Sequence, residues 1–356
     1  MRQILIFIVL SLLGVAAGAL SGVDPIRQEF FPAFAAFALT LGLYGSVSGI
    51  DLLAIRRRIK LAIVIVTLAV PLKILVSGLL LYLIHPLAVS FLLCVAMAQI
   101  DPLSVDSLLQ DKHTMSKEAK GLLRIWAAFD DPMTVLFGFL VLLPLVTGIS
   151  VQGSVASYLL GVALNVIPAV VLWLIAIKTR LLCNRTVAIP VLIAVLLFAF
   201  VTRSSLLAAL TGLMLRPIPE KVLQRVVSVF YFAIVFVVGM ATYNYGVDLR
   251  LGLLLAIIQF FVVQPATAIF VFRGTAGDLL RIAFAQQNGL TTLLMGIAFQ
   301  SLGFPVLHVL LPGIVFVNLL NLAVNKVYHW KEERGLVYPD TLPTVSEPDA
   351  PASAKD

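Results

Sequence analysis

Long apolar stretches recur along almost the entire chain and are separated by short polar segments. Most of them hold about 20 residues, the length of an α-helix that crosses the hydrocarbon core of a bilayer. The pattern predicts an all-α membrane protein with about twelve transmembrane helices, the eighth of which is short. The expected helices cover residues 3–20, 30–52, 60–84, 86–108, 122–146, 152–177, 186–202, 204–216, 222–245, 250–272, 277–300 and 303–327.

The basic residues between these helices are unevenly distributed, which indicates how the chain is oriented. Cytoplasmic loops of membrane proteins carry an excess of lysine and arginine. If the N-terminus is cytoplasmic, twelve helices place most basic loop residues inside, so we expect both termini in the cytoplasm. The residues expected inside are Arg56, Arg57, Arg58, Lys60, Lys112, Lys117, Lys120, Lys178, Arg180, Arg185, Arg216, Lys221, Arg225, Arg273 and Arg281, and those expected outside are Arg27, Arg203 and Arg250.

The two ends of the chain differ in character. The first apolar run follows Met1-Arg2-Gln3 and has the outline of a signal peptide, but its apolar core is longer than usual, so we expect a retained helix. The segment after Trp330 is rich in proline, serine, alanine and aspartate, which predicts disorder. We therefore expect one transmembrane domain over residues 1–330 and a disordered cytoplasmic tail over 331–356.

The composition supports a membrane protein and argues against a nucleic-acid-binding one. Of the 356 residues, 61% are hydrophobic and only 12% are charged, about half the charged fraction of a soluble domain. The net charge of +7 is concentrated in the loops of one side, so it is no signal for nucleic acid. Cys94 and Cys183 have no disulfide or metal-site spacing, and no cofactor is expected. We expect an integral protein of the bacterial inner membrane.

Two adjacent carboxylates, Asp130 and Asp131, lie inside the apolar range 122–146. A charged side chain at membrane depth costs at least about 2.5 kcal/mol, even by lenient insertion scales. Two in succession indicate that a proton, a cation or a fixed positive partner meets them. The pair is the leading candidate for a site that binds a monovalent cation and protons.

Two of the expected helices contain features that interrupt a helix. In the fourth, Asp101 precedes Pro102, which removes an amide donor and clashes with the preceding turn. In the eleventh, Gln287, Asn288 and Gly289 combine amide side chains with a flexible backbone. The two helices are seven apart and so cross the membrane in opposite directions. Interrupted helices at corresponding places in two inverted halves indicate a transporter site near the middle of the membrane.

These motifs resemble those of the monovalent cation:proton antiporter superfamily, and the resemblance covers most of residues 30–327. The segment Ala98-Gln-Ile-Asp-Pro102 is similar to the superfamily's Thr-Asp-Pro break. The segment from Gly121 to Asp131 is similar to the helix that carries its ion-binding Asp-Asp motif. Residues 41–52 and 231–240 resemble its second-helix exit and its ninth helix.

The resemblance implies two inverted repeats that form a dimerisation domain and a mobile core domain, with two crossed discontinuous helices in the core. It implies that Asp131 binds cation and proton in competition, that Asp130 lies next to it, and that Asp101 stabilises the crossing. The protein would then be a secondary transporter and no enzyme. We expect it to exchange protons for Na⁺ or K⁺ across the lipid bilayer as a homodimer.

The sequence departs from the superfamily at three places. Gln259 and Gln264 occupy the tenth helix, where the electrogenic branch has a buried lysine. Ile100 replaces the threonine of the Thr-Asp-Pro break, and the Arg/Gly-Glu motif of the eleventh helix is reduced to residues 287–289. Ion choice and stoichiometry therefore do not follow from the resemblance.

Lys73 offers a replacement for the missing lysine. It lies near the middle of the third expected helix, about a dozen residues from either end, too deep to reach the interface easily. The third helix is the inverted-repeat counterpart of the tenth. An unpaired buried lysine is costly, so Lys73 either pairs with Asp130 or Asp131 or faces a wet cavity between the domains.

Two other functions fit parts of this pattern. A sodium-coupled symporter of an organic anion shares crossed broken helices, but it needs more hydroxyl and amide groups and a substrate-sized cavity. An intramembrane aspartyl protease also needs two buried carboxylates, such as Asp101 and Asp131. That chemistry places them on separate helices facing each other, and the sequence lacks a Gly-x-Gly-Asp segment.

Overall fold

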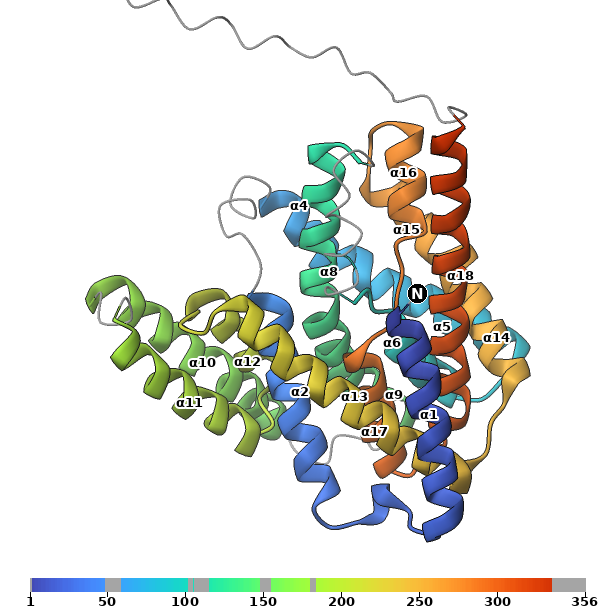
Figure 1. Cartoon of the computed structure of the whole chain (residues 1–356). Coiled ribbons are helices and arrows are strands. Elements are labelled where there is room, and N and C mark those ends of the chain that lie inside the picture. Colours follow the sequence, from blue (N-terminus) through green and yellow to red (C-terminus); the bar gives the residue numbers. More distant parts are fainter. Residues whose placement is uncertain are drawn as a thin grey trace, which may run out of the picture.

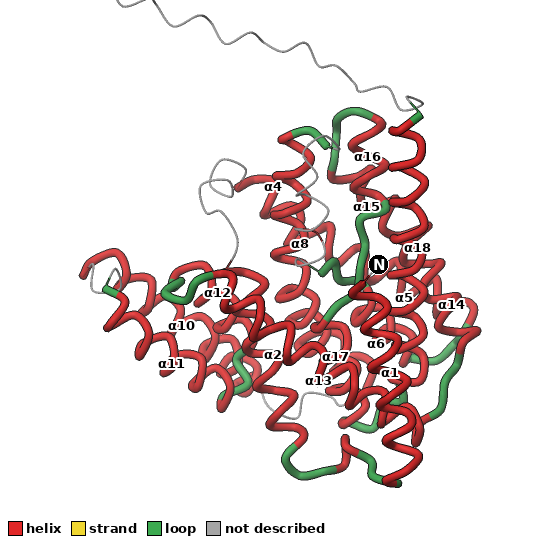
Figure 2. The backbone as a smooth tube through the Cα atoms, in the orientation of Figure 1, coloured by secondary structure: helices red, strands yellow, loops and turns green. Residues whose placement is uncertain are grey.

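The computed structural model describes residues 2–48, 59–101, 105, 115–147, 155–179 and 184–334. Within these ranges the chain is helical and contains no strand, which confirms the all-α class (Figure 2). The elements are α1 (Arg2–Ser21), the 3₁₀ turn η1 (Pro25–Arg27), α2 (Phe31–Ser48), α4 (Ile59–Val64), α5 (Val70–Ile84), α6 (Val89–Met97), α8 (Lys117–Phe137), α9 (Leu143–Thr147), α10 (Val155–Thr179), α11 (Arg185–Val201), α12 (Ser205–Met214), α13 (Glu220–Tyr245), α14 (Leu249–Ile257), α15 (Gln264–Val271), α16 (Ala276–Ala283), α17 (Leu290–Ser301), α18 (Leu307–Glu333) and the π-helical segments η2 (Ile65–Ala69), η3 (Gly138–Leu142) and η5 (Ile258–Val263).

The described helices have the length and surface of a membrane protein. Five are long and apolar enough to cross a bilayer, and four shorter apolar helices accompany them. Large apolar side chains lie fully on the outside, such as Val201 at 75% exposure and Leu83 at 72%. Contiguous exposed apolar surface is rare on soluble monomers, so the chain is an integral membrane protein.

Every range expected to cross the membrane contains a helix or a run of helices. The count of about twelve crossings is not confirmed, because several ranges hold helices too short to span the bilayer alone. Helix α6 has nine residues and α12 has ten. The predicted tail lies almost wholly outside the described residues, as do Pro102 and residues 49–52 of the segment that resembles the second-helix exit.

Two helical runs far apart in the chain are built alike, as expected for counterparts in inverted repeats. In α4–η2–α5 and in α14–η5–α15, a π-helical segment is followed by an α-helix with proline at its second residue, Pro71 or Pro265. The two runs also contact each other, α5 against η5 and α15 against η2. π-helical segments often occur at functional sites, and η2 also contacts α8, the helix that carries Asp130 and Asp131.

The helices surround a central helix, α2, which contacts α12 on one side and α17 and α8 on the other (Figure 1). Helices α10, α11 and α12 project from one side of the molecule, and α5, α6, α14 and α18 lie on the opposite side (Figure 1). Helix α1 packs closely along α13, since a Cβ atom on Gly14 would lie 2.2 Å from the Phe236 carbonyl oxygen. This arrangement places α8 and its two aspartates between the two sides.

Candidate functional site

Both predicted helix interruptions are present, and the interrupted segments cross. Helix α6 ends at Met97 and the chain continues without helical structure to Asp101, while residues 284–289 separate α16 from α17. At the crossing the Asp101 amide donates to the Gln287 carbonyl oxygen at 2.9 Å. A Cβ atom on Gly289 would lie 2.6 Å from Asp101 Oδ1. A side chain at position 289 would therefore force the Asp101 carboxylate to move.

Amide side chains satisfy the backbone groups that the interruption of α6 sets free. Gln286 Nε2 donates to the Met97 carbonyl oxygen at 2.7 Å. Asn288 Nδ2 donates to the same oxygen at 3.0 Å and to the Gln99 carbonyl oxygen at 3.3 Å. In a membrane interior such groups find no water and must be satisfied by protein. The amide-rich segment of the eleventh expected helix thus supports the break in the fourth.

A row of asparagines on α18 supports the other side of the crossing. The Asn318 side chain accepts from the Asn288 amide at 3.0 Å and donates to the Asn288 carbonyl oxygen at 3.1 Å. Asn321 Nδ2 donates to the Phe284 carbonyl oxygen at 2.8 Å, and Asn321 Oδ1 accepts from Gln287 Nε2. Asn318 and Asn321 are three residues apart and so share one face of α18, which predicts hydrogen bonds to a neighbouring helix. Their target, the broken backbone of the eleventh expected helix, is not evident from the sequence.

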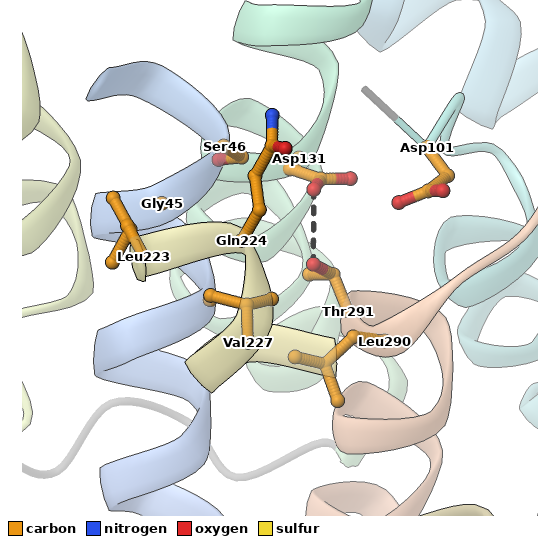
Figure 3. Close-up of a pocket in the computed structure, with 10 residues that line it drawn as sticks. Gly45, Ser46, Asp101, Asp131, Leu223, Gln224, Val227, Leu290 and Thr291 are labelled. Atoms are coloured by element: carbon orange, nitrogen blue, oxygen red, sulfur yellow. Dashed lines mark hydrogen bonds between the residues drawn. The ribbon is translucent and has the colours of Figure 1, made fainter. Parts of the chain in front are cut away.

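Asp130 and Asp131 are both buried on α8, and their side chains meet different surroundings. Asp131 lines a small cavity of about 30 Å³ together with Asp101. Thr291 Oγ1, at the first turn of α17, donates to Asp131 Oδ2 at 3.0 Å (Figure 3). The carboxylate of Asp101 extends toward that of Asp131 from the crossing segment (Figure 3). Asp131 is therefore the member of the pair that faces open space.

Asp130 instead meets a fixed positive charge. Lys73 Nζ on α5 lies 3.4 Å from Asp130 Oδ2, and neither side chain has any exposed area. The same ammonium lies 5.7 Å from the centre of the Trp126 ring, within the range of a cation–π contact. The expected pairing of Lys73 with one of the two aspartates is thus observed, and it involves Asp130.

The glutamines of the tenth expected helix have other partners. Gln259 Nε2 donates to the Cys94 carbonyl oxygen at 3.2 Å, and Gln264 Nε2 donates to the Ile282 carbonyl oxygen at 3.4 Å. Both side chains are buried. These hydrogen bonds join η5 to α6 and α15 to α16. Neither glutamine takes the place of a lysine beside the aspartates.

Sequence reasoning missed three polar residues of the cavity. Thr291 contacts Asp131 directly, and Ser46 of α2 and Gln224 of α13 line the same cavity (Figure 3). Serine, threonine and glutamine are tolerated in membrane helices at low cost and so give no strong signal. The one available cue for Thr291 is its place two residues after Gly289, at the start of the second half-helix.

Comparisons with known proteins agree with this geometry at the level of the fold. No family model and no curated protein sequence matches the chain. Two structures of the sodium proton antiporter MjNhaP1 from Methanocaldococcus jannaschii are similar. The first, at pH 8, has a TM-score of 0.69 and 16% sequence identity over 88% of this chain and 91% of that one. The second, from electron microscopy, has a TM-score of 0.62 and 14% identity over 92% and 91%. The chain therefore has the fold of this sodium proton antiporter over nearly its whole length.

Proposed function

We propose that this protein exchanges protons for a monovalent cation across the membrane, and that Asp131 binds the two in competition. The observation that carries the proposal is that the side chains of the two adjacent aspartates have different surroundings. The charge of Asp130 is balanced by Lys73 at 3.4 Å, whereas Asp131 lines a cavity. Asp131 is therefore the carboxylate of the pair that is placed to hold a cation or a proton.

The size and chemistry of the cavity suit a small cation. About 30 Å³ has room for roughly one or two water molecules or one ion that has shed most of its water. Carboxylate and hydroxyl oxygens are the ligands that hard cations prefer, and Asp131, Asp101 and Thr291 supply them. A proton on Asp131 removes the negative charge that attracts the cation. Binding of either species at this carboxylate therefore weakens binding of the other, and this competition couples the two fluxes.

The alternatives fit this cavity less well. An organic anion is too large for about 30 Å³, and two carboxylates in the wall would repel it. A peptide substrate of a protease is larger still. The similar structure belongs to a protein named as a sodium proton antiporter, which favours Na⁺ over K⁺ as the first ion to test.

The proposal is tested by transport in proteoliposomes that contain a pH-sensitive dye and an imposed proton gradient. Adding Na⁺, and separately K⁺ and Li⁺, should dissipate the gradient for the wild type with at least one of these ions. Asp131→Asn should abolish the response, because an amide cannot alternate between a proton and a cation. Asp248→Asn is a matched control: Asp248 caps α14 at 2.9 Å from the Leu251 amide, and asparagine caps equally well. No response of the wild type to any of the three ions would refute the proposal.

A further inference from the structure

A second and much larger cavity lies away from the aspartates. It has a volume of about 440 Å³ and is bounded by α2 and α12 on one side and by α8, η3 and α17 on the other. Most of its wall is apolar, with Leu39, Leu136, Phe139 and Leu294 among the larger side chains, and Thr40, Asn165 and Ser301 add polar groups. The cavity has no part in the chemistry of Asp131.

This cavity reaches the lipid-facing surface of the protein. Leu302 lines it and is 54% exposed, and Phe37, on the same helix as Leu39, is 36% exposed. In a membrane such side chains contact acyl chains. The exposed side chain of Leu302 therefore gives a hydrocarbon tail an apolar surface at which to enter the cavity.

Arg203 supplies the one cation among the residues that line this cavity. Arg203 lies two residues after the end of α11, next to the C-cap residue Thr202. Arg203 has a φ of +53°, and among the described residues it alone combines a positive φ with a side chain. Glycine usually occupies this position after a helix, since other residues adopt it at a cost. An arginine kept in this conformation holds a guanidinium beside the cavity, and guanidinium binds phosphate through paired hydrogen bonds.

We propose that this cavity binds an anionic phospholipid, with one acyl chain inside and the phosphate on Arg203. The apolar part of the wall would contact the acyl chain, and the exposed Leu302 marks where the acyl chain would enter. Arg203 would give the preference for an anionic headgroup. The bound acyl chain would contact both α2 and α17, which form opposite walls of the cavity. The proposal does not depend on the exchange of ions.

Native mass spectrometry of the full-length protein in detergent tests it, with equal amounts of phosphatidylglycerol and phosphatidylcholine as probes. The wild type should retain phosphatidylglycerol in preference by about tenfold, the scale of one charge-assisted contact. Arg203→Gln should remove the preference, whereas Arg250→Gln, which changes an exposed arginine that does not line the cavity, should keep it. Ala298→Phe places a ring in the cavity and should reduce retention of both lipids.

Each variant is first checked for a single monodisperse peak, and Ala298→Leu replaces Ala298→Phe if the larger side chain prevents folding. Retention of no phospholipid by the wild type would overturn the proposal. A headgroup preference that is unchanged in Arg203→Gln would also overturn it. So would lipid retention by Ala298→Phe equal to that of the wild type. Replacement of the phospholipid by free fatty acid in the wild type would also overturn it.

Discussion

Lys73 Nζ lies 3.4 Å from Asp130 Oδ2, and the two side chains, 57 positions apart, are shielded completely from solvent. A buried ion pair of this kind matters to the stability of the fold mainly because removing one partner is costly. The remaining charge would then be buried without a partner. The pair also fixes α5 against α8 beside the crossing. It leaves Asp131, the next residue, as the carboxylate for which we propose ion binding.

Lys73→Gln should destabilise the protein by about 3–5 kcal/mol, because it leaves the negative charge of Asp130 buried and uncompensated. The free energy of unfolding in detergent measures this effect. Adding Asp130→Asn to the same chain should restore much of the loss, since both partners are then neutral amides. Lys221→Gln, at the exposed start of α13, should change little. If Lys73→Gln were as stable as the wild type at neutral pH, the ion pair would have no structural importance.

Gly289→Ala should disrupt the crossing of the two interrupted segments, because the added methyl group would lie 2.6 Å from Asp101 Oδ1. Overpacking of this kind costs about 1–3 kcal/mol, and exchange should fall with it. Gly121→Ala on α8 is the matched control, since a Cβ atom there meets nothing within 4 Å, and alanine favours a helix. Equal melting temperatures for the two variants would show that the close approach at Gly289 does not exist.

Thr291→Val should raise the cation concentration needed for half-maximal exchange by about tenfold, because it removes the hydroxyl bonded to Asp131 at 3.0 Å. Thr291→Ser keeps the hydroxyl and should behave nearly as the wild type. Initial exchange rates over a range of Na⁺ concentrations distinguish the two variants. A serine variant as impaired as the valine variant would point to packing instead of the hydroxyl.

Asp101→Asn should lower the apparent affinity for the cation while the fold is retained. The amide keeps the size of the side chain, but it removes one of the two carboxylates that line the cavity. The maximal rate at saturating Na⁺ should fall less than the affinity. Complete loss of exchange with an unchanged melting curve would instead make Asp101 a direct carrier alongside Asp131.

The sequence predicted those parts of the site that have a high free-energy cost inside a membrane, namely charged side chains and interrupted helices. Asp130, Asp131 and Lys73 are conspicuous because a charge in an apolar run requires a partner, and the breaks at Asp101 and Gly289 are conspicuous because they interrupt helices. The partner of Lys73 could be narrowed to two residues by that reasoning, but only the packing of α5 on α8 decides between them.

Other features carry no such cost and could not be predicted. The π-helical segment at Ile65–Ala69 is as apolar as its flanks. Thr291, Ser46 and Gln224 are ordinary polar residues whose meeting at one cavity depends on three helices far apart in the chain. The number of membrane crossings also depends on how short helices such as α6 and α12 pack, which their apolar composition does not reveal.

The central claim, that cation and proton compete at Asp131, is tested most directly by proton release. Na⁺ is added to purified protein in weakly buffered detergent solution, and the protons released per protein are measured with a pH-sensitive dye. The wild type should release protons on binding Na⁺, Asp248→Asn should release as many, and Asp131→Asn should release none. Undiminished release from Asp131→Asn, or Na⁺ binding by the wild type without any proton release, would contradict the account.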